Sequence, residues 1–209
     1  MNIETLSAAL ATSLHVDPRL VQRRARYLRE AGLFPRGIGP AAPSLAVEDV
    51  ATLLLSVLAA GEPKDAVAAV KRCQQLRPYT VIGRHDLRGR VVEQPMPSAN
   101  APLWRLPLVE ALARALRDTV LHDGAVILGL SVSRSGAWAQ LALGADDVPT
   151  LAGVFIRYAD EEEIELARAC DETALRDEGA MHVVASATAT LFEDLVAVLD
   201  PVDMAKEAA

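Results

Sequence analysis

The sequence predicts an α+β protein, with an N-terminal all-α domain and a C-terminal domain that combines a mostly antiparallel sheet with helices. Through the first 77 residues, apolar side chains recur at intervals of three and four, as they do in helices packed on a core. From residue 108 onward, helical patterns alternate with short β-rich runs bounded by turn residues. The stretch between them, residues 78–107, contains five prolines and reads as a connector. We therefore expect domains at residues 1–77 and 108–200, with residues 201–209 as a flexible tail.

Start and stop signals divide the N-terminal domain into four helices. The second helix is the best marked, because Asp17 supplies an N-cap carboxylate, Pro18 suits the first helical position, and Gly32 suits the C-terminal cap. Prolines and glycines make residues 33–44 a loop. The four expected helices span residues 3–14, 18–31, 46–60 and 63–76.

The C-terminal domain alternates helices and strands. Two β-rich runs flank Ser135-Gly136 and predict a hairpin over residues 124–143. Further strand pieces are expected at Val81-Ile82 and Val91-Val92, inside the connector. The remaining expected elements are a helix at 108–122, a strand at 151–158, a helix at 160–177, a strand at 181–190 and a helix at 191–199.

The net charge of −7 conceals an asymmetry between the two halves. Residues 1–92 contain 13 Lys+Arg and 8 Asp+Glu, a balance of +5, whereas residues 93–209 contain 8 and 20, a balance of −12. A basic half joined to an acidic half points to a polyanion as a possible partner of the basic half. Arginine abundance alone carries little weight, because only three of the 21 basic residues are lysines, so the whole chain favours arginine.

The expected location is the cytoplasm. No apolar run reaches the roughly 18 to 20 residues that a membrane-spanning helix needs, and the start of the chain has an acidic Glu4 and no basic leader. Cys73 and Cys170 stand alone, without a neighbouring cysteine or histidine at metal-ligand spacing. We expect reduced thiols, although a disulfide between them remains possible on paper.

The stretch from Leu6 to Leu28 has the spacing of a helix-turn-helix. In that motif small residues line the crossing of the two helices, an apolar residue fills the turn, and the second helix turns an apolar stripe inward. Here Val16 would fill the turn. The expected crossing residues are Ala8, Ala9 and Ala11, and the expected inward stripe is Val21, Ala25 and Leu28.

The opposite face of the second helix carries long hydrogen-bond donors. Arginine and glutamine reach both phosphates and base edges, and the first turns of such a helix meet the major groove. Arg36, after the helix, would touch DNA from a wing formed by residues 36–39, and the simpler alternative for these residues is a plain glycine turn. The predicted DNA-binding residues are Arg19, Gln22, Arg23, Arg26, Arg29 and Arg36.

The sequence HVDPRLVQRRARYLREAGLFPRG, followed by SLAVEDVATLL, resembles the head of MerR-type and related winged helix-turn-helix regulators. Gly32-Leu33 and Pro35 match the GL-P element that ends the recognition helix of that pattern, and Glu48-Asp49 match the acidic start of the helix after the wing. The resemblance covers about residues 4–58 and implies duplex-DNA binding. Two residues depart from it: His15 stands where the turn usually has glycine, and Arg24 where an inward apolar residue is common.

The simpler interpretation is an αα-hairpin whose arginine face is only solvated. Arg88-Gly89-Arg90 resembles a minor-groove hook but more simply belongs to a solvated linker. No catalytic motif is present: His122 and His182 have no constrained partner, and the acidic run from Asp160 favours a helix N-terminus. We therefore expect that the protein is not an enzyme and that it binds neither a cofactor nor a metal ion.

Three functions remain open. The first is a bacterial or phage transcriptional regulator, the second a small-terminase-like subunit that recognises DNA for phage packaging, and the third a module whose arginine helix binds an acidic protein. In the first two the partner is double-stranded DNA and the C-terminal domain supplies a homodimer or higher homo-oligomer, or senses a ligand. Trp104 and Trp138 are candidate anchors in that domain.

Overall fold

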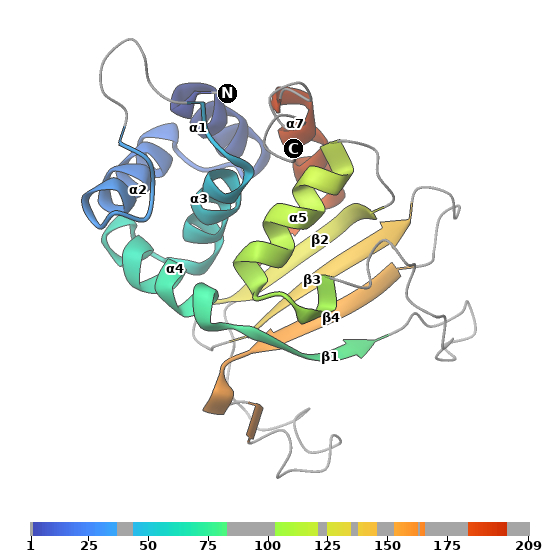
Figure 1. The fold of residues 1–209 in the computed structure, drawn as a ribbon. Coiled ribbons are helices and arrows are strands. Elements are labelled where there is room, and N and C mark those ends of the chain that lie inside the picture. Colours follow the sequence, from blue (N-terminus) through green and yellow to red (C-terminus); the bar gives the residue numbers. More distant parts are fainter. Residues whose placement is uncertain are drawn as a thin grey trace.

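The computed structural model describes residues 2–36, 44–82, 103–120, 125–134, 138–145, 153–162, 164–165 and 184–199. Within these ranges six α-helices accompany one five-stranded antiparallel sheet, so the α+β prediction is confirmed. Figure 1 shows α5 lying across one face of the sheet, with α1–α4 gathered beside it and α7 next to α1. The helices are α1 (Ile3–Ser13), α2 (Pro18–Glu30), α3 (Val47–Ala59), α4 (Ala66–Gln75), α5 (Leu108–Val120) and α7 (Ala189–Val198).

The sheet has the strand order β1-β4-β3-β2-β5, and every neighbouring pair is antiparallel. The predicted hairpin is confirmed as β2 and β3, and the predicted strand at Val81-Ile82 lies in β1. Residues 91 and 92, and most of the helix expected at 160–177, lie outside the described residues. The strands are β1 (Arg77–Ile82), β2 (Ala125–Ser133), β3 (Trp138–Ala145), β4 (Gly153–Ala159) and β5 (Val184–Thr188).

Alternation along the strands gives the sheet a buried and an outer face. On β4, Ile156 and Tyr158 are fully buried on the side of the helices, so Arg157 between them faces outward. Register places Gln140 opposite both Arg157 and Ser131, and the Ser131 and Ser186 hydroxyls lie 3.0 Å apart. The helix-covered face is therefore apolar, and the outer face carries a polar row across β5, β2, β3 and β4.

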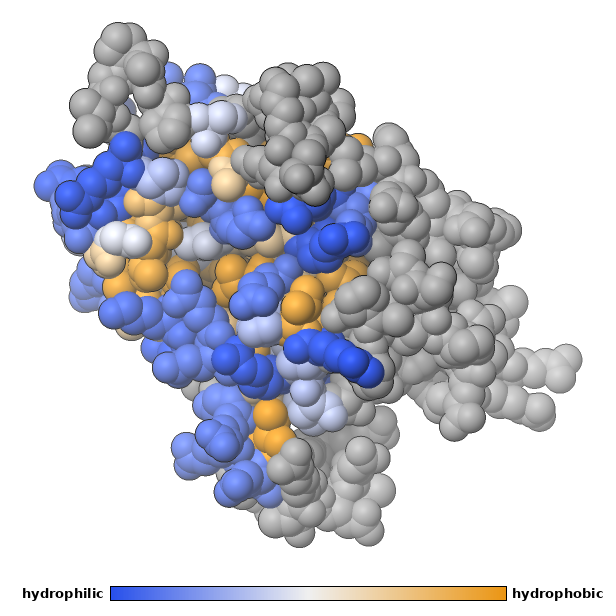
Figure 2. Space-filling model, in the orientation of Figure 1, coloured by the Kyte–Doolittle hydropathy of each residue, from blue (hydrophilic) through white to orange (hydrophobic). Residues whose placement is uncertain are grey.

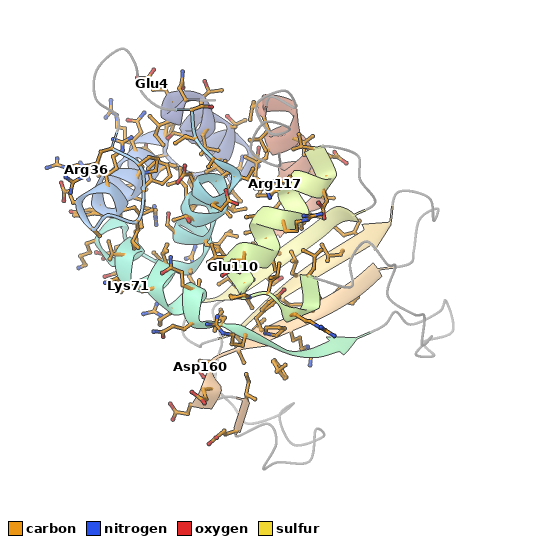
Figure 3. The ribbon with its side chains drawn as sticks, viewed as in Figure 1. Glu4, Arg36, Lys71, Glu110, Arg117 and Asp160 are labelled. Carbon is orange, nitrogen blue, oxygen red and sulfur yellow. The ribbon has the colours of Figure 1, made fainter. Side chains whose placement is uncertain are left out.

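One hydrophobic core extends through the helices and the inner face of the sheet. Helix α3 lies at its centre, and its residues from Val50 to Ala59 are all buried. Arg117 on α5 donates to Glu48 at the start of α3, with 3.0 Å between Nη2 and Oε1 (Figure 3). The helices before residue 77 therefore pack directly on the later elements, and the division into domains at residues 1–77 and 108–200 stays a prediction.

Short 3₁₀ turns begin or precede two of the helices. The helix expected from residue 63 begins with the turn η2 (Pro63–Asp65), and only then does α4 follow. The turn η4 (Leu103–Arg105) lies inside the expected connector and buries Leu103 in the core. The elements outside these turns end within a few residues of the expected bounds, because proline, glycine and capping residues mark most of those ends.

Candidate nucleic-acid interface

A tight turn joins α1 to α2. The Val16 N–H donates to the Ala11 carbonyl at 3.0 Å, and the His15 N–H donates to the Thr12 carbonyl at 3.3 Å. These two bonds close a Schellman motif, which stops a helix and redirects the chain. Val16 is partly buried against the core, as predicted for the residue that fills the turn. The chain then enters α2, where the Asp17 carboxylate accepts from the Arg19 N–H at 2.8 Å.

His15 is left-handed, with φ of 52°, and no other non-glycine residue among those described has a positive φ. A Schellman motif requires this conformation at the first residue past the cap, which explains why glycine is usual there. His15 differs in residue type from the glycine of the MerR-like pattern, but it adopts the left-handed conformation for which glycine is usual there. This departure therefore leaves the geometry of the turn intact.

The end of α2 repeats the same motif with a glycine. Gly32 has φ of 73°, the Leu33 N–H donates to the Leu28 carbonyl at 2.9 Å, and the Gly32 N–H donates to the Arg29 carbonyl at 3.1 Å. The prediction of Gly32 as the C-terminal cap is confirmed. Phe34 is buried just beyond the turn, and the Arg29 guanidinium lies 5.8 Å from the centre of its ring.

Helix α2 has one buried and one exposed face. Val21, Ala25 and Leu28 are all fully buried, so the predicted inward stripe is confirmed. The prediction for α1 needs a correction. Ala8 is exposed and does not line a crossing, whereas Ser7 and Ala11 are buried with Leu6 and Leu10. Successive residues are about 100° apart around a helix. Ser7 and Ala11 are four residues apart and share the buried face, whereas Ala8 is turned about 100° away from Ser7.

The predicted contact residues Arg19, Gln22, Arg23 and Arg26 are all exposed on the outer face of α2. Arg26 is partly neutralised, because its Nε lies 2.8 Å from Glu30 Oε1, and this hydrogen bond raises the pKa of Arg26. Within the described part of the chain, the Arg19 and Arg23 guanidiniums have neither a hydrogen bond nor an ion pair. The first half of α2 therefore presents the greater uncompensated positive charge.

Two further predicted contacts differ from these four. Arg29 is half-buried, and its Nε makes no hydrogen bond with any described residue. Its stacking on Phe34 places it at the edge of the exposed face. Arg36 is exposed on the side of the molecule where α2 lies (Figure 3). The predicted wing continues into residues 37–43, which lie outside the described residues, as do Arg88 and Arg90.

Arg24, the second departure from the family pattern, is 4% exposed. Its Nη2 donates to the carbonyls of Ala60 and Gly61 at 3.1 and 3.2 Å, at the C-terminal end of α3. That end has unpaired carbonyls and a partial negative charge, so a cation stabilises it. Arg24 is therefore a structural residue, and its aliphatic stem takes the inward place of an apolar side chain.

Arg134, just past the end of β2, binds the same helix end. Its Nε donates to the Leu58 carbonyl at 3.0 Å. Burial, and then the neighbouring charge of Arg134, lower the pKa of Arg24. Two guanidiniums from distant parts of the chain thus converge on α3. Sequence patterns gave no sign of this arrangement, because Arg24 and Arg134 are far apart in the sequence and meet only in the folded structure.

Among the described residues, the other side chains considered in the sequence do not gather into a second site. Ser133 is buried, Ser131 pairs with Ser186, and Trp138 is half-buried on β3. Cys73 is a free thiol, and burial raises its pKa to about 11. His122, His182 and Cys170 lie outside the described residues, as does the Trp104 side chain.

Over the described ranges, no three His, Cys, Asp or Glu side chains gather as a metal site would require, and no helix is long and apolar enough to cross a membrane. Comparisons of the chain with protein-family models, with curated proteins and with solved structures found no match.

Proposed function

We propose that this chain binds duplex DNA by placing α2 in the major groove. The observation that carries the proposal is the position of Arg19, Gln22 and Arg23. They occupy the first turns of a helix that follows a Schellman turn, opposite a fully buried stripe. An exposed helix of this kind fits the width of the major groove, and its early residues then reach base edges.

Electrostatics support this orientation. Residues 17–36 carry five arginines besides Arg24, against two carboxylates, Asp17 and Glu30. The acidic residues of the protein concentrate in its second half, which would be repelled by a phosphate backbone. Figure 2 shows hydrophilic side chains along the edge of the molecule on the side of α2, with apolar patches among them. The favoured approach to DNA is therefore through the helical side of the molecule.

The test is fluorescence anisotropy with the full-length protein and labelled duplexes enriched from a random pool. We expect binding that weakens steeply with salt, with a slope of log K against log[salt] between about −3 and −5 for four to five phosphate contacts. Arg23→Ala should cost about 1–3 kcal/mol and relax base preference at one position if Arg23 reads a base. Arg157→Ala, which removes one charge from the outer face of the sheet, is the matched control. No binding by the wild-type protein at low salt would overturn the proposal.

We further propose that DNA binding serves transcriptional regulation, which we favour over a role in phage DNA packaging. A regulator that reads paired half-sites is expected to be a two-fold dimer, whereas a packaging subunit is expected to form a larger ring. Sedimentation equilibrium of the full chain distinguishes the two. The third possibility, an acidic protein partner for α2, predicts no preference among duplex sequences, which the enrichment experiment measures directly.

A further inference from the structure

A second cationic surface lies on α4 and at the start of β1. Lys71 and Arg72 are exposed on α4, and Arg77 is exposed at the first position of β1. The Arg77 Nη1 donates to the Gln74 carbonyl at 3.0 Å, which holds this side chain against the end of α4. We refer to Lys71, Arg72 and Arg77 as the α4 cationic surface.

Within α4 itself no carboxylate accompanies Lys71 and Arg72, whereas Arg77 pairs with Ala159, the residue before Asp160, and so lies close to acidic residues. The chain has 28 Asp+Glu against 21 Lys+Arg, yet none of the acidic residues falls between positions 66 and 82. An exposed helix that served only for solubility usually intersperses both signs, often as pairs four residues apart. Helix α2 shows such a pair at Arg26 and Glu30, and η2 shows a similar one at Glu62 and Lys64. Lys71 and Arg72 are thus less compensated by carboxylates of their own element than the cations of α2 and η2 are.

The packing of α4 points Lys71 and Arg72 outward. Ala66, Ala69, Val70 and Cys73 form the buried face of the helix. At about 100° per residue, positions 71 and 72 fall on the opposite side, one to each side of its centre. Figure 3 shows Lys71 on the same flank of the molecule as Arg36. Both side chains are therefore available to a partner that approaches this flank.

The α4 cationic surface lies mainly on a helix that packs against α2. Both η2 and α4 pack against α2. Tyr27, on the edge of the exposed face of α2, lies close enough to Lys64 of η2 to influence its pKa, although Glu62 has the larger effect. Lys64 itself is paired with Glu62 at 3.0 Å. On this side of the molecule, η2 and α4 therefore both contact α2. The lysine of η2 is paired with a carboxylate, and the cations of α4 are not paired within their own helix.

From this arrangement we propose that the α4 cationic surface binds DNA phosphates beside the groove that α2 enters. The inference rests on the proposed function and extends it to a contact with the sugar–phosphate backbone, independent of base sequence. Lys71 and Arg72 are adjacent on the exposed side of α4, and Arg77 begins β1 shortly after that helix ends, so these side chains can reach neighbouring phosphates of one strand. These contacts would fix the register of the protein on the duplex while α2 reads the bases.

The test compares Lys71→Gln/Arg72→Gln with the wild type over a series of salt concentrations. Glutamine retains helix propensity and removes the charge. We expect the slope of log K against log[salt] to become shallower by about 1.8, since each lost phosphate contact contributes about 0.9, with base preference unchanged. Arg77→Gln, as an independent variant, should change the slope by about 0.9. Arg157→Gln, on the outer face of the sheet, should leave the slope unchanged.

The outcomes separate this inference from the proposed function. If the wild type binds DNA and Arg23→Ala relaxes base preference, but the double variant keeps the wild-type slope, only the α4 contact is refuted. If the wild type does not bind DNA at low salt, both proposals fail together. The urea midpoint of the double variant serves as the folding control, and it should correspond to a change in stability within about 0.5 kcal/mol, because both side chains are exposed.

Discussion

Replacing Arg24 tests whether a buried arginine holds α2 in place. The Arg24→Ala variant loses two charge-assisted hydrogen bonds to the Ala60 and Gly61 carbonyls and the packing of a buried stem. Each hydrogen bond to a charged group contributes about 1.5–3 kcal/mol in favourable cases, and two lost methylenes contribute about 0.8 kcal/mol each. These losses add up to about 5–8 kcal/mol. Against them, the variant no longer buries a guanidinium beside Arg134, and avoiding that desolvation offsets several kcal/mol. We expect a net destabilisation of about 2–3 kcal/mol.

Two further variants isolate the cause. Arg24→Met keeps most of the stem and removes the donors, so it should be less destabilising than alanine, by about 1–2 kcal/mol relative to the wild type. Arg23→Ala, one residue away on the exposed face, should change stability by less than about 0.5 kcal/mol. Urea unfolding followed by far-UV circular dichroism measures all three, with the slope of the transition checked for constancy. If Arg24→Met is as stable as the wild type, water satisfies the carbonyls and the proposed capping role is wrong.

Three other positions give separate predictions. His15→Gly should stabilise the protein by about 0.5–1 kcal/mol, because the left-handed conformation costs a non-glycine residue about 1–2 kcal/mol and the extra entropy of unfolded glycine offsets part of the gain; an unchanged urea midpoint would contradict this. The Cys73 thiol has its pKa raised to about 11, so above about pH 9 the unfolded chain releases a proton that the native state keeps, and stability falls as pH rises toward 11. Relative to Cys73→Ala, the wild type should lose about 1 kcal/mol between pH 8 and pH 10, since one pKa unit corresponds to about 1.4 kcal/mol; a flat difference would refute the burial argument. Tyr158→Phe should leave stability equal or raise it by about 1 kcal/mol, because the buried Tyr158 hydroxyl has no hydrogen-bond partner among the described residues; a loss of that size in thermal or urea unfolding would mean that the hydroxyl is bonded.

Local signals in the sequence were sufficient for the elements and for the two faces of α2. Capping residues such as Asp17 and Gly32 act on the backbone within a few positions, so their effect can be read from the chain. The spacing of Val21, Ala25 and Leu28 likewise follows from the helix period alone. The environment of Arg24 could not be predicted in this way, because its partners belong to the end of another helix, 36 and 37 residues further along the chain.

The order of the strands and the position of α7 also could not be predicted from the sequence pattern. Two runs joined by a short turn predict a hairpin, but nothing in their composition says that β5 pairs with β2 or that β1 pairs with β4. Those choices depend on which arrangement buries most apolar surface in three dimensions. The contact between α1 and α7, marked by the hydrogen bond from the Ser13 hydroxyl to Asp194 at 2.5 Å, joins residues near opposite ends of the chain for the same reason.

The position of α2 is fixed by α3, and α3 is in turn fixed by the rest of the protein. Arg24 connects α2 to the C-terminal end of α3, while Arg134 connects the end of β2 to the same turn. Because α3 is buried along almost its whole length, it cannot shift by itself without opening the core. A change at the β2–β3 end of the sheet would therefore act on the same helix end that binds Arg24, through the Leu58 carbonyl. Substituting Arg24 and Arg134 together should accordingly give a non-additive change in stability, since removing either guanidinium relieves the repulsion felt by the other.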